Sequence, residues 1–410
     1  MRPLACITAA ILALWYMGLA SAGVMPFPDP IAPKVMIISM FAPEAQIWYT
    51  GLPTTTNLGN LLALNISLPG LSMAYPHVHC TPSRDICQLT TGEGEINAAA
   101  SITALVLSSA RNTGVAFDLR KTYFLIAGIA GVNPRRATLG SVALARYAVQ
   151  VALQHEFDAR EMPDGFGTGY VAFGTKQPYE YPAVLYGTEV MEVNEGLRDA
   201  AYEFARRAEL VDSEDAVAYR GRYGAKGNAS ASHDYAAGVG GPAVVRCDAA
   251  TSDVYYSGTL LSEAFEKVTE VWTNGTGRYC MTAQEDNATL EVLVRMAVHG
   301  LVDFGRVIVM RTGSNFDRPP PDVTPYEHLL GLHQNGFSIA IENIFHAGIE
   351  IVKGILGDWD GVFARGIPAP NYIGDVFGSL GGQPDFGPGS LTDGKVVSEK
   401  GLAHAPKVWE

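Results

Sequence analysis

Polar side chains follow several of the buried strands that the sequence predicts. Five places stand out: Glu44 after the first strand, and the segments 90–97, 127–131, 281–287 and 310–317. In open α/β sheets, ligands gather where strands end. These segments therefore contain the candidate residues of a binding or catalytic site.

Glu44 has the residue type and the surroundings of a general base. It lies next to Pro43 and shortly before Trp48 and Tyr49. Nearby aromatic rings partly desolvate a carboxylate and raise its pKa, which suits a base that activates water. The alternative is an ordinary glutamate in a solvated loop.

Two glycine-containing segments bring backbone groups within reach of a ligand. Thr91 and Gly92 lie at a predicted strand-to-helix junction, where hydroxyls and amides suit an anion or a sugar hydroxyl. Glu93 and Glu95 follow directly and make a phosphate less favourable there. Gly128 lies in an Ala-Gly-Ile-Ala-Gly segment that allows close approach of the backbone. Turn formation and tight packing explain these glycines equally well.

Two further segments combine acids with other polar groups. Glu285 and Asp286 precede a predicted helix and have the acceptors that paired ribose hydroxyls require, although helix capping by Asp286 is the alternative. Arg311, Asn315 and Asp317 are predicted to share one short turn after a strand. There an amide or acid can hydrogen-bond a purine nitrogen while Arg311 faces a nucleophile; the alternative is a plain polar turn.

Strands alternate with helices along most of the chain. Buried strands are predicted at 34–40, 123–130 and 306–311, and helices at 96–110 and 288–298. This alternation predicts an α/β fold in which helices cover a central sheet.

The size of the chain indicates one large domain with an elaboration, or two domains. We assign residues 34–375 to the main domain and residues from about 153 to 241 to an insertion or cap, because that interval is rich in Tyr, Gly and charge. An amphipathic helix near 193–208 is expected to pack on the sheet rather than to extend it. The Gly- and Pro-rich tail, 376–410, is expected to wrap the surface or fray.

The composition limits the partners and the compartment. The chain is 48% hydrophobic and 17% charged, and its net charge of -13 argues against nucleic acid or an anionic membrane as a partner. An apolar run from Leu4 to Ala20, followed by small residues before Gly23, predicts a signal peptide over 1–22 and a protein secreted to the extracellular or cell wall space. An uncleaved anchor is the alternative. No later segment is long and apolar enough to span a bilayer.

Four cysteines remain once Cys6 leaves with the signal, an even number that suggests two disulfides in an oxidising compartment. Proximity along the chain predicts the pairs Cys80–Cys87 and Cys247–Cys280.

The cysteine spacing is not a zinc pattern. His77 and His79, beside Cys80, leave a metal site open, but we predict neither a metal nor another resident cofactor. Glycosylation sequons occur at Asn65, Asn228, Asn274 and Asn287.

Together these segments resemble an ordered set found in one superfamily. The stretch 34–44, the block 91–99, the block 127–131 followed by 139–141, the turn 256–259 and the turn 311–315 are similar to those of purine nucleoside phosphorylases and methylthioadenosine nucleosidases. The mature chain as a whole, with its insertion and the block 281–287, more closely resembles the fungal purine nucleoside permeases. The resemblance implies a three-layer, nucleoside phosphorylase-like fold with a mixed central sheet and a long insertion. It also implies a purine nucleoside ligand and is compatible with a homo-oligomer.

The resemblance to the nucleosidases implies a role for each matching residue. Glu44 falls at the water-activating carboxylate, Thr91 at a hydroxyl of the nucleophile site and Arg311 at its arginine. Glu285 falls where the superfamily binds ribose, although Gln284 replaces the usual methionine before it. Further substrate-binding candidates in the same segments are Gly92, Gly128, Ser257, Thr259 and Asp286.

Asn315 falls on the purine-binding acid, which is Asp in nucleosidases and Asn in some phosphorylases. An amide donates a hydrogen bond to a developing purine anion but cannot protonate it. Either Asn315 therefore suffices, or nearby Asp317 supplies the proton.

Cleavage of an N-ribosidic bond passes through an oxocarbenium-like state that needs ribose contacts, leaving-group stabilisation and a nucleophile. Water is the favoured nucleophile, because Ala42-Pro43-Glu44 stands where phosphorylases commonly carry a Gly-Asp-Pro-x-Arg anion site, and an anionic Glu44 repels phosphate. We therefore expect a secreted purine nucleosidase, with phosphate as a co-substrate in the alternative phosphorylase. The competing hypothesis is a nucleoside-binding component of a transport system.

Overall fold

The computed structural model describes residues 30–108, 117–224 and 234–387. The predicted signal peptide, the sequon at Asn228 and the end of the tail from residue 388 lie outside the described residues, as do the last two residues of the helix predicted at 96–110.

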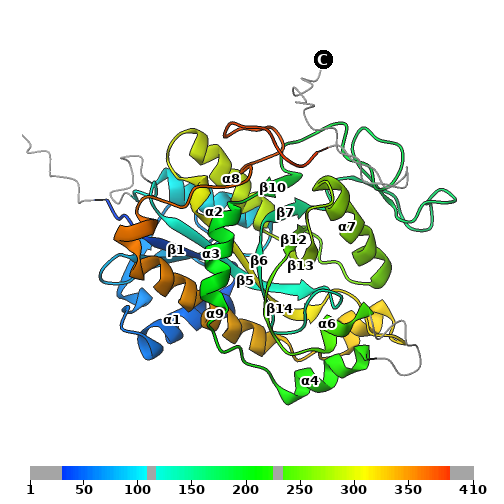
Figure 1. The fold of residues 1–410 in the computed structure, drawn as a ribbon, viewed down its shortest axis with the longest axis horizontal. Helices are drawn as coiled ribbons and strands as arrows, with labels where there is room; N and C mark the ends of the chain where they lie inside the picture. Colours follow the sequence, from blue (N-terminus) through cyan, green and yellow to red (C-terminus); the bar gives the residue numbers. More distant parts are fainter. Residues whose placement is uncertain (1–29, 109–116, 225–233, 388–410) are drawn as a thin grey trace, which may run out of the picture.

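A mixed sheet of twelve strands forms the centre of the described structure (Figure 1). Its main path runs β10-β7-β12-β13-β5-β1-β4-β3-β2, while β14 pairs with β5 and with β6, and β6 pairs in turn with β11. The strands are β1 Val35–Ser39, β2 Leu64–Ser67, β3 His77–Cys80, β4 Ile86–Thr90, β5 Tyr123–Val132, β6 Val142–Ala145, β7 Tyr147–Gln150, β10 Val190–Glu192, β11 Val244–Arg246, β12 Asp248–Thr251, β13 Tyr279–Ala283 and β14 Val307–Phe316. The short strands β8 His155–Glu156 and β9 Tyr170–Val171 form a separate pair.

Helices cover both faces of this sheet (Figure 1). The α-helices are α1 Ala42–Thr55, α2 Glu95–Leu107, α3 Glu195–Ala205, α4 Glu214–Arg220, α6 Ala236–Val239, α7 Thr259–Trp272, α8 Asp286–Val298 and α9 Phe337–Gly357. Short helical turns are η1 Leu61–Ala63, η2 Gly221–Tyr223, η3 Phe304–Arg306, η4 Glu327–Gly331 and η5 Trp359–Phe363.

Alternating side chains of the central strands build the two sides of the core. In β1, Met36 and Ile38 pack in the cluster that holds the buried faces of α2 and α8. Val35 and Ile37 pack in the cluster that holds α1, α3 and α9. Both faces are covered, so every residue of β1 is buried, as expected for a strand between parallel neighbours. The predicted three-layer α/β fold is confirmed.

The strand end predicted at Arg311 is wrong, and so is the alternative that places Glu44 in a solvated loop. The strand predicted to end at Arg311 continues to Phe316, because β14 remains paired with β5 through a bulge between Gly313 and Asn315 and is flanked by β6. Arg311 and Asn315 therefore lie in a strand rather than in a turn. Glu44 lies in the first turn of α1, which begins at Ala42 and has Pro43 in its first turn, where proline is favourable because its missing N–H would have no partner within the helix.

The predicted insertion contributes to the central layers. β10 pairs antiparallel with β7, and α3, the amphipathic helix predicted near 193–208, packs against α9 and the sheet. Figure 1 shows α3 crossing the face of the sheet. The boundaries at about 153 and 241 remain a prediction.

The described part of the tail lies on this body. Just before the tail, the backbones of Glu192 and Gly374 form a β-bridge, and within the tail Asp385 forms an ion pair with Arg146 at 2.8 Å. Phe386 is buried against Tyr147.

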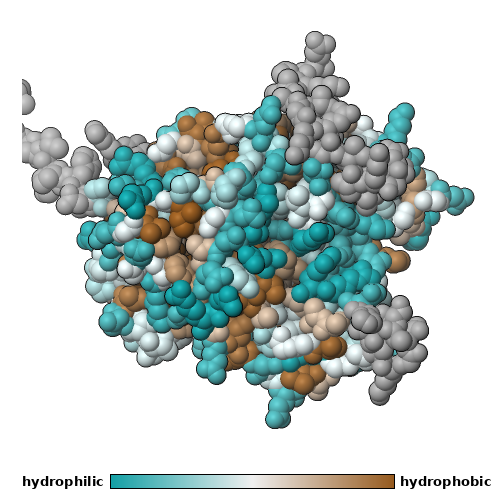
Figure 2. Space-filling model, in the orientation of Figure 1, coloured by the Kyte–Doolittle hydropathy of each residue, from teal (hydrophilic) through white to brown (hydrophobic). Residues whose placement is uncertain are grey.

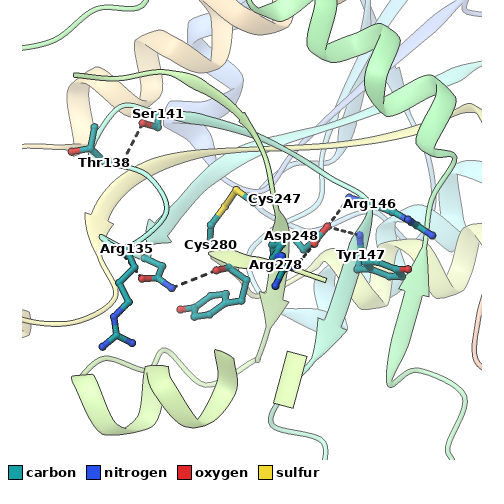
Figure 3. Close-up of a disulfide and its surroundings, with 11 residues drawn as sticks. Arg135, Thr138, Ser141, Arg146, Tyr147, Cys247, Asp248, Arg278 and Cys280 are labelled. Atoms are coloured by element: carbon teal, nitrogen blue, oxygen red, sulfur yellow. Dashed lines mark hydrogen bonds between the residues drawn. A yellow bond between two sulfur atoms is a disulfide. The ribbon is translucent and has the colours of Figure 1, made fainter. Parts of the chain in front are cut away.

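Both predicted disulfides are confirmed. Cys80 and Cys87 join β3 to β4, and Cys247 and Cys280 join the segment before β12 to β13 (Figure 3). Next to the second disulfide, the buried carboxylate of Asp248 accepts backbone N–H groups from Arg146 and Tyr147 at 2.9 Å, and from Arg278 at 2.6 Å (Figure 3).

Hydrophilic residues predominate on the face shown in Figure 2, with hydrophobic residues in smaller patches. No helix within residues 30–108, 117–224 and 234–387 is long and apolar enough to span a bilayer.

The two disulfides should contribute unequally to stability, because a cross-link that closes a longer loop restricts the unfolded chain more. Their cysteines are 33 residues apart for Cys247–Cys280 and 7 apart for Cys80–Cys87. We expect replacement of Cys247 and Cys280 by alanine to lower the free energy of unfolding by about 4 kcal/mol, and the matched change at Cys80 and Cys87 by about 2.5 kcal/mol. Urea unfolding of both double variants measures the difference, and equal losses would contradict the loop-length account.

Candidate active site

A cavity of about 880 Å³ opens where the central strands end. Its floor is formed by residues at or after the ends of β1, β5, β13 and β14. Its other walls come from the segments 211–215, 252–256 and 329–342, which are far apart in the sequence. The cavity therefore lies at the edge of the sheet where the polar segments were predicted to meet.

Arg311 is the centre of a buried ion cluster at the floor of the cavity. Its guanidinium donates to Glu285 Oε2 at 3.2 Å, to both carboxylate oxygens of Asp286, and to the backbone oxygen of Ile129 at 3.2 Å. Burial alone lowers the pKa of Arg311, but Asp286 and Glu285 outweigh it and raise that pKa above its ordinary value. The arginine therefore remains charged and ties β14 to β5 and to the start of α8.

Glu44 is fully buried and accepts two backbone hydrogen bonds. Its Oε2 accepts from Met40 N, and its Oε1 accepts from Ile129 N, both at 2.7 Å. Burial raises the pKa of Glu44 to about 7, while Arg311 and the two backbone donors limit the rise. A carboxyl group that titrates near neutral pH beside a cavity has the property that a general base requires.

Gly128 allows Glu44 and Arg311 to approach the same stretch of β5. A Cβ atom at this position would lie 1.9 Å from Met40 Cε, 2.7 Å from an Arg311 nitrogen and 2.8 Å from Glu44 Oε1. Any larger side chain would push the base and the arginine apart, so Gly128 shapes the site by having no side chain.

Glu285 connects the loop before α2 to this cluster. Its Oε1 accepts from Gly94 N at 2.9 Å, while its Oε2 accepts from Arg311. Burial raises the pKa of Glu285, and Arg311 opposes that effect. Each carboxylate oxygen can accept a second hydrogen bond, so Glu285 retains capacity for a hydroxyl group in the cavity.

Asn315 and its neighbours form another polar part of the lining. Ser314 Oγ donates to Asn315 Oδ1 at 2.9 Å, and Asn315 Nδ2 donates weakly to the backbone oxygen of Phe316 at 3.3 Å. Tyr255 also lines the cavity. The lining here thus offers an oriented amide beside an aromatic ring, a combination suited to a heteroaromatic base.

Asp317 also lines the cavity, but its carboxylate is fully engaged by protein groups. Its Oδ1 accepts from Arg318 Nε at 2.8 Å, and its Oδ2 accepts from Tyr279 at 2.6 Å and from Arg318 at 2.9 Å. Ser257 in turn donates to the Asp317 backbone oxygen at 3.3 Å. These bonds favour a positioning role for Asp317 over the delivery of a proton.

Several predicted site residues do not reach the cavity surface. Asp286 is fully buried behind Arg311, so its carboxylate holds the arginine and cannot contact a ribose. Thr91 is also fully buried, and its hydroxyl donates to Gly92 O at 2.8 Å. Ser257 holds the Asp317 backbone, and Thr259 begins α7. Thr91, Gly92, Gly128, Ser257, Thr259 and Asp286 are absent from the described lining.

Some lining residues were missed because nothing in their local sequence marks them. Tyr255 comes one residue before the turn 256–259 that carried the resemblance. Thr282, whose Oγ1 accepts from Gly131 N at 2.8 Å, lies in β13 within the segment 281–287, but only Glu285 and Asp286 were singled out in that segment. Residues 211–215 come from the predicted insertion, and only the folded chain brings them to the cavity.

The histidine pair left open as a metal site has few ligands. The rings of His77 and His79 lie 6.0 Å apart, and His79 Nδ1 lies 2.6 Å from Asn65 Oδ1. Cys80 is not available as a thiolate because it is in a disulfide. Within the described residues, no group of three or more His, Cys, Asp or Glu side chains could hold a metal ion.

Comparison with known proteins gives two kinds of similarity. A family model described as "Purine nucleoside permease (NUP)" matches residues 32–368. Over 362 residues the chain is 45% identical to a purine nucleoside permease of Candida albicans, covering 87% of this chain and 83% of that protein. It is 41% identical over 362 residues to a probable purine nucleoside permease of Schizosaccharomyces pombe, covering 86% and 97%.

Among solved structures, the chain is similar to a 5′-methylthioadenosine/S-adenosylhomocysteine nucleosidase from Neisseria meningitidis in complex with methylthio-immucillin-A. That match has 14% identity, a TM-score of 0.41, and covers 78% of this chain and 98% of that one. The futalosine hydrolase of Helicobacter pylori matches at 12% identity with a TM-score of 0.44, covering 80% and 98%.

The raised pKa of Glu44 should make stability fall as pH rises. The folded protein holds this proton up to about pH 7, whereas the unfolded chain releases it near 4.5, so the folded state binds more protons between these values. The stabilisation is present at lower pH and is lost through neutrality. We expect the free energy of unfolding of wild type to fall by about 3 kcal/mol more than that of Glu44→Gln between about pH 4 and pH 8.

Urea unfolding at a series of pH values measures this difference. Glu203→Gln, an exposed glutamate on α3, is the matched control and should follow wild type. Parallel curves for wild type and Glu44→Gln would show that Glu44 does not titrate near neutral pH.

Proposed function

This chain belongs to the purine nucleoside permease family, and from that premise we propose that it binds purine nucleosides in the cavity and cleaves their N-ribosidic bond by hydrolysis. The observation that carries the proposal is the buried Glu44, whose pKa of about 7 suits a base, on the lining of a cavity that also contains Glu285 and Asn315. These three groups supply the base, the sugar contact and the leaving-group contact that the reaction needs.

In the proposed reaction, ionised Glu44 takes a proton from a water molecule as the water oxygen bonds to C1′ of the ribose. The electrons of the broken C1′–N bond pass to the purine. Asn315 donates a hydrogen bond to a purine nitrogen and stabilises that developing charge, and a solvent proton completes the free base. Glu285 accepts hydrogen bonds from ribose hydroxyls, and Arg311 keeps Glu285 in place.

The charge around Arg311 supports water over phosphate as the nucleophile. Asp286 and Glu285 are ion-paired with this guanidinium, and Glu44 lies close enough to influence its pKa. Arg311 is the only arginine or lysine among the described lining residues. A phosphate dianion would therefore meet one neutralised cation and several carboxylates, which is unfavourable. We propose no resident cofactor for this reaction.

We also propose that the protein acts after secretion, outside the cell. The apolar run behind residue 2 and the small residues before Gly23 support this proposal, as do the two disulfides, which form and persist in oxidising compartments. In this account a separate carrier takes up the free base.

Base release tests the proposed activity directly. Purified protein incubated with adenosine, guanosine or inosine should release free base without phosphate, and added phosphate should not accelerate release. Glu44→Gln should lower kcat by about 10²- to 10⁴-fold because it removes the base, while nucleoside binding persists. Glu203→Gln should retain wild-type activity.

The same assay separates the alternatives. Release that depends on phosphate would favour a phosphorylase, and binding without release would favour a transport component. The rate should rise with pH through about 7 as Glu44 ionises. A fully active Glu44→Gln variant would remove Glu44 from the role of base.

Mass spectrometry of the protein from culture medium tests secretion. We expect the mature chain to begin at Gly23 and Asn287 to carry no glycan. Asn287 is buried, and its Nδ2 donates to Thr188 O at 2.7 Å and to Ala148 O at 3.3 Å, so the folded chain has no room for a sugar on it. Asn65 is exposed, so this sequon is the one with which the buried Asn287 is compared. A retained N-terminal segment, or a glycan on Asn287, would contradict this account.

A further inference from the structure

The lining of the cavity is far more acidic than the proposed chemistry requires. Seven carboxylate residues line it, against one arginine and no lysine among the described residues; they are Glu44, Glu93, Asp212, Asp215, Glu285, Asp317 and Glu342. The reaction uses Glu44 and Glu285, so the remaining acids need another explanation.

Ion pairs compensate some of these charges but not all of them. Asp212 pairs with Arg220 at 2.6 Å, and Asp317 pairs with Arg318 at 2.8 Å. Glu93, Asp215 and Glu342 are exposed, and no described lysine, arginine or histidine forms an ion pair with them. Three exposed carboxylates without an ion-pair partner among the described residues therefore line the cavity.

The size of the cavity does not limit the ligand to a bare nucleoside. Its volume of about 880 Å³ is near the upper end of the range of about 300–1,000 Å³ for ligand pockets, which leaves room for a group the size of a phosphate. If size does not exclude a phosphorylated ligand, the charge of the lining residues determines whether it binds. Clefts lined by charge of one sign concentrate the field, which repels ligands of the same sign.

We propose that this acidic lining makes the site selective by charge: it admits neutral and cationic purine nucleosides and excludes nucleotides. The inference rests on the proposed function and specifies its substrate class. This selectivity also defines the order of two reactions. A nucleotide outside the cell must first lose its phosphate by hydrolysis of the phosphate ester, and only the resulting nucleoside is a substrate here.

A series of ligands that differ in charge at the 5′ position tests this selectivity. Titration calorimetry on the Glu44→Gln protein, which binds without rapid turnover, compares adenosine 5′-monophosphate, adenosine and 5′-amino-5′-deoxyadenosine. At 10 mM salt we expect the nucleotide to bind at least about tenfold more weakly than adenosine, and the cationic analogue to bind at least as tightly as adenosine. At 0.5 M salt the nucleotide should bind no more than about threefold more weakly than adenosine, because salt screens the repulsion.

A variant without the three exposed carboxylates tests whether they cause the weaker binding of the nucleotide. Combined Glu93→Gln, Asp215→Asn and Glu342→Gln substitutions should reduce the nucleotide-to-adenosine ratio of Kd by about tenfold at 10 mM salt. The matched control removes three exposed carboxylates that do not line the cavity, by Glu161→Gln, Asp164→Asn and Asp360→Asn. The control should change the ratio by less than about twofold.

The possible outcomes distinguish a failure of charge selection from a failure of the proposed nucleoside cleavage. Equal binding of the nucleotide and adenosine at low salt, or an unchanged ratio in the cavity variant, overturns charge selection while leaving nucleoside cleavage intact. Binding of adenosine without base release by wild type overturns the nucleosidase but not the charge selection. If adenosine does not bind at all, both proposals fail.

Discussion

The buried ion cluster around Arg311 is the constraint on which the rest of the site depends. The arginine lies on β14, its partner Glu285 directly precedes α8 and its partner Asp286 begins α8, and it also bonds to the backbone of β5, so one side chain links three elements. Removal of one partner from a buried ion pair typically costs about 3–5 kcal/mol, because the other charge remains uncompensated. The members of the cluster are buried, and Arg311 and Glu285 also border the cavity.

The properties of Glu44 follow from this arrangement. It is buried beside the same stretch of β5, where desolvation favours its neutral form and Arg311 favours its charged form. The balance leaves its pKa of about 7 within the range in which a base works at neutral pH. The acidic surroundings that discourage phosphate in the proposed reaction also discourage phosphorylated ligands. The proposed selection of the nucleophile depends on the carboxylates around Arg311, and the proposed selection of the substrate on Glu93, Asp215 and Glu342, so both proposals depend on negative charge in one cavity.

The sequence predicted the central elements well because they are strongly patterned. The buried strand β1 and the largely buried strand β5 are apolar runs, and both disulfides join cysteines that are consecutive along the chain. Arg311 was expected in a turn because its polar neighbours resemble one, yet pairing with strands from distant parts of the chain keeps them extended. The contributions of Tyr255 and of residues 211–215 depend on the same long-range pairing, which leaves no local signal. Asp286 was predicted to contact the substrate, and only the fold shows that its carboxylate pairs with Arg311.

The most direct test of the central claim is a crystal structure of the protein with a purine C-nucleoside, in which a carbon–carbon bond joins the base to the ribose and resists hydrolysis. The account predicts that the purine lies within hydrogen-bond distance of Asn315, that the ribose hydroxyls contact Glu285, and that Glu44 faces C1′ across a water molecule. A complex in which the ligand occupies the cavity with its ribose turned away from Glu44 and Glu285 would contradict the account.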